Sequence, residues 1–145
     1  MRLFLKGFTF LFSVIALSSV STFASAKCSF DLRGTWQSYT LYGGGLYYAA
    51  CTFSTDRDGN IESGSICDIY NANGTVFNEG LTAEGQYVTD DACNVTGSLS
   101  IGGGAGIVTI LNARMSNGGA LINGVNQITS GAGTETVTFT MFRLS

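Results

Sequence analysis

The sequence predicts an all-β protein, an antiparallel up-and-down meander of about eight strands that closes on itself. Three observations carry this prediction. Proline is absent while glycine occurs 20 times, β-branched and aromatic residues dominate between the glycines, and no segment after residue 27 repeats apolar residues with the helical period. Dipeptides such as Asn73-Gly74 supply the positive φ angles that tight hairpin turns require.

Eight strand-forming stretches follow one another, each bounded by turn residues. We place them at 33–42, 46–55, 60–70, 75–82, 86–101 with an interruption near Asp90-Asp91, 106–114, 119–129 and 134–144. The turn between the fourth and fifth stretches is expected at Ala83-Glu84-Gly85. Glycines that interrupt a strand, such as Gly80 and Gly124, are typical of bulges or of bends in a curved sheet. Closure into a barrel also removes exposed sheet edges.

Alternation along the strands indicates one side that faces a core and one that faces water. In the last strand Val137, Phe139 and Met141 share a side with Arg143, whereas threonines occupy the other side. This pattern is expected of an antiparallel sheet around a single core. The stretch from Leu46 to Cys51 is apolar on both sides, so part of the barrel exterior is expected to be covered or to bind something.

The first 26 residues have the features of a secretory signal peptide. Arg2 and Lys6 precede an apolar run from Phe8 to Val20, and Ala24-Ser25-Ala26 forms an A-x-A cleavage site. The run is too short for a membrane-spanning helix. We expect a single domain over residues 27–145, located in the periplasm or secreted.

Four cysteines in a small exported chain predict two disulfides. Cys51 and Cys67 flank the turn Asp58-Gly59-Asn60, and counting back from that turn places them opposite each other on adjacent strands. Cys28 would then join Cys93. In the chain-entropy model the two bridges contribute about 3 and about 4 kcal/mol. A zinc site is disfavoured, because the sequence has neither C-x-x-C spacing nor a histidine.

Charge and residue content exclude several functions. Without the signal peptide the chain keeps all ten acidic residues and five of its seven basic ones, a net charge of −5. A mildly acidic domain with no basic cluster argues against nucleic acid as a partner. The absence of histidine excludes Ser-His-Asp, Cys-His and His-based metal centres, and we expect no cofactor and no metal. The cysteines and the wet strand faces disfavour a membrane-embedded barrel.

Three motifs are interpreted as turns. Asp90-Asp91 is a tandem acid whose side chains would point to opposite sides of a strand, so it is expected to be a solvated loop. Asp56 to Glu62 offers several oxygens around a glycine, but it lacks the length and helices of an EF-hand. Gly102 to Gly106 precedes no helix, so it lacks the helix N-terminus that a phosphate loop requires.

Gly34-Thr35-Trp36 on the first strand, together with Arg143 at the end of the last, resembles the calycin superfamily of lipocalins, avidins and fatty-acid-binding proteins. In that group a G-x-W tryptophan lies at the closed end of an up-and-down barrel and a late arginine packs across it. Cation–π contact gives such a pair a physical reason. The resemblance implies a calycin-like barrel in which Gly34, Trp36 and Arg143 close one end, so function is sought at the other.

Tyrosines concentrate on the first three strands, and Tyr42, Tyr48 and Tyr70 are the candidate ligand-binding residues. An eight-stranded barrel is just wide enough to be filled by side chains or to hold one small ligand. The tyrosines could line such a cavity, or fill it as aromatic residues commonly do in small cores. Both interpretations stay open at this point.

Three functions are compatible with these features. The first, which the calycin resemblance implies, is an exported non-catalytic barrel that binds a small apolar or amphipathic ligand. The second is a barrel that binds an extracellular protein, such as a secreted protease inhibitor with its arm at Lys27 to Leu32, or a surface interaction module. The third is a cofactor-free enzyme resembling allene oxide cyclase or dirigent barrels. Of these three functions, the sequence favours the non-catalytic barrel over the enzyme.

Overall fold

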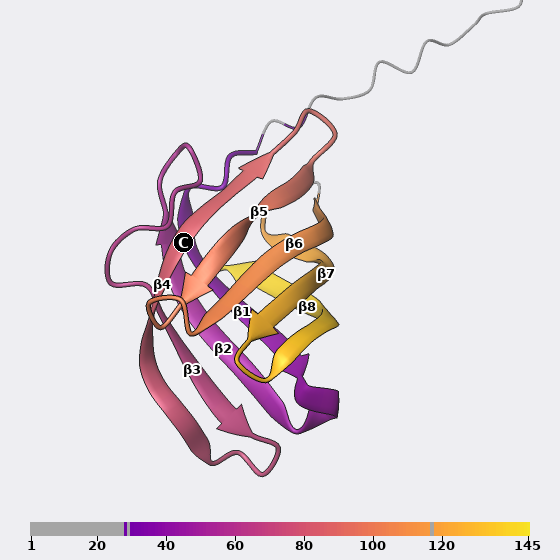
Figure 1. Cartoon of the computed structure of the whole chain (residues 1–145). Helices are drawn as coiled ribbons and strands as arrows, with labels where there is room; N and C mark the ends of the chain where they lie inside the picture. The colour runs from indigo at the N-terminus through magenta and orange to yellow at the C-terminus, as the bar shows by residue number, and fades with distance from the viewer. Residues whose placement is uncertain (1–27, 29, 117) are drawn as a thin grey trace, which may run out of the picture.

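The computed structural model describes residue 28, residues 30–116 and residues 118–145. Eight antiparallel strands close into a barrel in which each strand pairs with its sequence neighbours and β1 pairs with β8 (Figure 1). The strands are β1 (Gly34–Tyr42), β2 (Tyr47–Thr55), β3 (Ile66–Asn71), β4 (Val76–Thr89), β5 (Asn94–Ile101), β6 (Gly106–Met115), β7 (Leu121–Ser130) and β8 (Gly133–Arg143). The predicted fold class is confirmed. The predicted signal peptide lies outside the described residues.

The two ends of the barrel differ in their connections. At one end, called the open end here, short turns join β1 to β2 through the 3-10 turn η1 (Gly43–Gly45), β3 to β4, β5 to β6, and β7 to β8. At the other, the closed end, lie the long connection from β2 to β3, the β4–β5 turn, the lead segment 30–33 and the C-terminal residues. The backbone N–H of Leu144 donates to the carbonyl of Thr35, which carries the β1–β8 pairing to the end of the chain.

Two disulfides stabilise the barrel, and both predicted pairings are confirmed. Cys51 and Cys67 lie directly opposite each other on β2 and β3 and are bonded. Cys28 is bonded to Cys93 and ties the lead segment to the β4–β5 turn. The N–H of Cys28 also donates to the carbonyl of Asp91 at 2.8 Å. No free cysteine remains among the described residues.

The predicted turn at Ala83-Glu84-Gly85 is wrong. β4 runs without interruption through these residues, which pair with Leu99–Ile101 of β5. Gly85 has a φ of +149°, and a Cβ there would lie 2.1 Å from the carbonyl oxygen of Ser98. The glycine therefore allows the neighbouring strand a close approach within the sheet, and it does not end the strand. The hairpin turn falls instead at residues 90–93, where the sequence predicted only an interruption.

The predicted strand 60–70 is shorter in the structure, because β3 begins only at Ile66. Residues 56–65 form a loop that is joined to the barrel by isolated pairings, one of them between Thr55 and Ile61. The Asp56 carboxylate accepts the N–H groups of Asp58 and Asn60 at 2.9 and 2.8 Å, and this local bonding competes with strand pairing. The segment therefore caps the closed end.

The largest fully buried side chains gather at the closed end and form the core. They come from seven of the eight strands, and they are Trp36, Phe53, Cys67, Val95, Met115, Ile122 and Met141. The predicted core side of β8 is confirmed at Phe139 and Met141, which are buried. Toward the open end, the interior is not filled.

Candidate functional site: a cavity in the barrel

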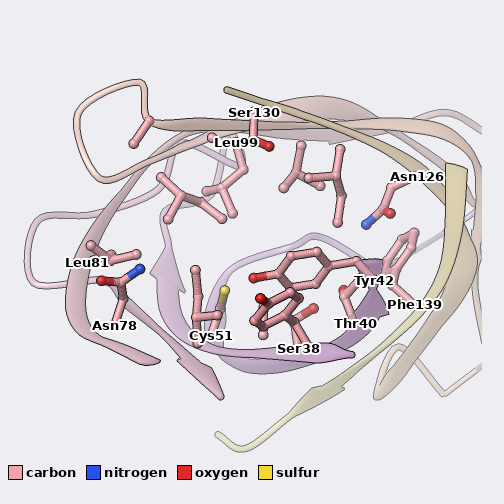
Figure 2. A pocket seen from close by; sticks show the side chains of 18 of the residues that line it. Ser38, Thr40, Tyr42, Cys51, Asn78, Leu81, Leu99, Asn126, Ser130 and Phe139 are labelled. Carbon is pink, nitrogen blue, oxygen red and sulfur yellow. The ribbon is translucent and has the colours of Figure 1, made fainter. Parts of the chain in front are cut away.

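A cavity of about 490 Å³ occupies the barrel interior on the side of the open end (Figure 2). It extends from Ala105 and Ala132, which lie in turns at the rim, down to Phe53 and Met141 above the core. Its volume falls within the range of about 300–1,000 Å³ that small-molecule sites occupy. All eight strands contribute to a mostly apolar wall, which includes Ile69, Leu81, Leu99, Val108, Ile110 and Phe139.

The cavity exists because the inward positions at mid-barrel carry small side chains. Successive inward residues of β1 are Trp36 in the core, then Ser38 and Thr40 on the cavity wall. On β2 the inward residue at the same level is Ala49. An eight-stranded barrel leaves room for little more than its own side chains. Small residues at this level therefore create the space that a ligand would occupy.

Three aromatic side chains narrow the mouth. Tyr42 and Tyr47 face each other across η1 with ring centroids 5.6 Å apart, and Phe77 of β4 lies 5.5 Å from the Tyr47 ring. Burial is the main cause that raises the pKa of Tyr42, and the neighbouring Tyr47 raises it further. Phe77 is 58% exposed, so neighbouring residues cover only part of its ring. A ligand that enters the cavity has to pass these rings.

The rim is fastened by one carboxylate. The β1–β8 pairing ends at Thr40 and Phe139, and above it Glu135 accepts the backbone N–H groups of Gly43 and Gly44 at 2.5 and 3.2 Å. This contact joins η1 to β8 where the two strands no longer pair. It also places a negative charge at the mouth.

The polar groups of the wall are neutral. No described residue that lines the cavity is an acid, a lysine or an arginine. Asn126 of β7 is 3% exposed, and its Oδ1 has no hydrogen-bond partner among the described residues. Tyr87 lies deep in the cavity with its ring 5.8 Å from that of Phe53, and burial raises the pKa of its phenol strongly. The phenol therefore stays protonated at physiological pH.

Of the three predicted ligand-binding tyrosines, the structure places one in the cavity and two outside it. Tyr42 lines the cavity. Tyr48 and Tyr70 do not, because strand alternation turns both outward, where their rings stack at 4.7 Å. Placing these two in the barrel interior is therefore wrong. Cys51 pairs inside the barrel, and counting back from it in steps of two reaches Ala49 and Tyr47, a signal that would have identified the correct face of β2.

Of the lining residues only Tyr42 was predicted to bind a ligand, and those missed include Tyr47, Phe77 and Asn126. Phe77 lies beside a register shift in the β3–β4 pairing, which alternation alone does not reveal. Asn126 lies on the regularly alternating β7, on the same side as Ile122 and Ile128, so the position was accessible from the sequence. It was missed because polar residues in strands usually face water.

The residues of the Gly-Thr-Trp motif lie at the closed end and none of them lines the cavity. Trp36 is 1% exposed, and its Nε1 donates to the carbonyl of Leu32 at 2.7 Å. The guanidinium carbon of Arg143 lies 4.8 Å from the Trp36 ring centroid, and the two residues pair directly across β1 and β8. A Cβ at Gly34 would lie 2.4 Å from the carbonyl oxygen of Ser145. The predicted contact between Trp36 and Arg143 is therefore present.

Apolar side chains also lie on the outside of the barrel, mainly on β1 and β8. Tyr39, Leu41 and Phe142 are each 44% exposed or more. They border a shallow groove along the junction of β1 and β8, together with Tyr48. This outer groove and the internal cavity are separated by the wall of the barrel.

No protein-family model, curated protein or solved structure matches this chain. The geometry of the cavity therefore carries the functional argument alone. Within the described part of the chain, no three acids or cysteines are grouped so that they could hold a metal ion. Nor does that part contain a helix with the length and apolarity needed to cross a membrane.

Proposed function

We propose that this protein works outside the cytoplasm as a carrier or receptor of a small, mainly apolar ligand, which it binds in the barrel interior without converting it. The observation that carries the proposal is the cavity of about 490 Å³ with its apolar wall. A barrel that served only as a scaffold would gain stability from filling this space. The two disulfides support an oxidising compartment.

Binding is favoured over catalysis by the chemistry of the wall. Its polar side chains are hydroxyls, phenols and amides. General acid–base or nucleophilic catalysis requires a group whose pKa is matched to proton transfer or that is activated by a neighbouring base. Burial raises the pKa of both Tyr42 and Tyr87, which moves these phenols further from neutrality. The cavity therefore fits retention of a ligand better than its conversion.

A matched pair of variants on β2 tests the proposal. Ala49 is buried and lines the cavity, whereas its neighbour Ala50 points outward, opposite Tyr39. The neutral fluorescent probe N-phenyl-1-naphthylamine should bind the wild-type protein with increased emission. Ala49→Phe, which fills the cavity, should weaken this binding at least about tenfold, while Ala50→Phe should not change it.

The circular dichroism spectra of both variants establish that each is folded before binding is compared. Failure of the wild-type protein to bind the probe, or of any lipid extract from its own source to displace it, would overturn the proposal. Equal binding by the two folded variants would also overturn it, because the probe would then bind somewhere other than the filled cavity.

A further inference from the structure

Asn126 is the least expected residue in the cavity wall. It lies on β7, paired with Ile110 of β6 and Val137 of β8, and the next inward residue toward the mouth is Ile128. Its carboxamide is almost completely buried, and the Oδ1 finds no partner in the described protein. Leaving a buried polar atom unpaired is unfavourable, and native structures rarely do so without a reason. A leucine would satisfy packing at this position.

The carboxamide is placed where a ligand would reach it. Figure 2 shows the Asn126 side chain directed into the cavity, on the side where Thr40, Tyr42 and Phe139 also lie. A carboxamide presents two donors and one acceptor, and a half-turn of the group exchanges the side that faces the cavity. A hydroxyl or an amide N–H on a ligand can therefore donate to the unpaired Oδ1.

The charges around the cavity select against ionic ligands. Among the described residues, the wall holds no charged side chain to neutralise a buried carboxylate or ammonium, and burying an unpaired charge is costly. At the mouth, the carboxylate of Glu135 lies beside η1. It adds repulsion toward an anion that approaches the cavity.

This inference rests on the proposed function. We propose that the ligand is uncharged and carries one hydrogen-bond donor, an alcohol or an amide N–H, on an apolar body, and that Asn126 anchors this group inside the barrel. Such a ligand would satisfy the buried carboxamide and leave the remaining apolar wall in contact with its hydrocarbon part. Anionic fatty acids are disfavoured as ligands by the same features.

Three compounds that share a phenyl ring and a four-carbon chain test the selectivity: n-butylbenzene, 4-phenyl-1-butanol and 4-phenylbutanoate. Each is titrated as a competitor of N-phenyl-1-naphthylamine at neutral pH. The alcohol should displace the probe most effectively, and the carboxylate should be at least about tenfold weaker than the alcohol. A carboxylate that binds as tightly as the alcohol would overturn the inference and leave ligand binding by the cavity intact.

The anchor is tested by Asn126→Leu against a control on the same strand. Asn123 of β7 faces outward, where its Oδ1 accepts a hydrogen bond from Thr140 at 2.9 Å. Asn126→Leu should abolish the advantage of the alcohol over n-butylbenzene, keep n-butylbenzene binding, and melt no lower than the wild-type protein without ligand. Asn123→Leu should keep the wild-type order of affinities.

The possible outcomes distinguish the two proposals. An unchanged preference for the alcohol in Asn126→Leu would show that Asn126 is no anchor. A marked loss of thermal stability in that variant would show that the asparagine serves folding, and this would also overturn the assignment. Absence of binding by all three compounds and the probe to the wild-type protein would instead overturn the proposed function itself.

Discussion

The closed and open ends of the barrel are made from the same eight strands but hold different kinds of side chain. On β1 the inward residue of the closed end is Trp36, and two inward positions further on it is Thr40. On β2 the corresponding residues are Phe53 and Ala49. A change in side-chain size over a few residues thus divides one barrel into a packed core and a cavity. The packed core therefore lies at one end of the barrel, and the cavity of the proposed binding site lies toward the other.

Among substitutions that test this difference between the two ends, the largest loss of stability is expected at Trp36. Trp36→Ala should lower the free energy of unfolding by about 3–5 kcal/mol, because it removes a large, completely buried side chain and leaves a cavity in the core. Urea unfolding followed by circular dichroism measures the change. The fraction that remains folded should still bind N-phenyl-1-naphthylamine. A variant of wild-type stability that has lost only binding would contradict the assignment of Trp36 to closure.

The second effect concerns the Cys28–Cys93 bridge at the same end. Replacing both cysteines by serine should cost about 4 kcal/mol in the chain-entropy model, since the bridge closes a long loop. Cys93 is the only non-glycine among the described residues with a positive φ, at 64°. Cys28→Ser combined with Cys93→Gly should therefore be less destabilised than the double serine variant, by about 1 kcal/mol. Thermal unfolding of the two variants compares them directly, and equal melting temperatures would refute this reasoning.

At the open end a comparable truncation should barely change stability. Phe77→Ala removes a ring that is 58% exposed, so the free energy of unfolding should change by no more than about 1 kcal/mol. Dissociation of N-phenyl-1-naphthylamine, followed by stopped-flow fluorescence, should become faster because the mouth widens beside Tyr47. A large loss of stability with unchanged dissociation would show that the aromatic residues at the mouth belong to the core.

The sequence predicted the closed end far better than the open one, and the reason is physical. The disulfides follow from four cysteines with few alternative partners, and the contact between Trp36 and Arg143 was implied by the calycin resemblance. The cavity depends instead on which side of a strand each residue faces. That assignment is reversed by each register shift, and β3–β4 and β6–β7 both contain such shifts. Phe77 was overlooked beside one of these shifts, whereas Tyr48 lies on the regularly paired β2 and was misplaced because the inward face of that strand was not counted from Cys51.

The smallest effect is expected at two turns of the closed end, which have the same arrangement of hydrogen bonds. The Asp90 carboxylate accepts the N–H groups of Ala92 and Asn94 and the side-chain amide of Asn94. Asp56 has equivalent contacts with Asn60. The pKa of both carboxyl groups is lowered. The main cause is the hydrogen bond from the asparagine side chain, and backbone hydrogen bonds add to it. Their contribution to stability is therefore complete above the unfolded-state pKa of about 4 and is lost as the pH falls through the lower folded-state value.

Asp90→Asn removes one of these two titrating groups and should make the melting temperature less sensitive to acid below about pH 4. At neutral pH the change should be slight, since the carboxylate is exposed and solvent screens its interactions. Glu84→Gln is the control, because this exposed carboxylate lies within β4 and belongs to neither turn. Melting curves from pH 2 to 7 compare the variants. If Asp90→Asn follows the wild-type protein throughout the acid range, this turn is not a source of the acid sensitivity.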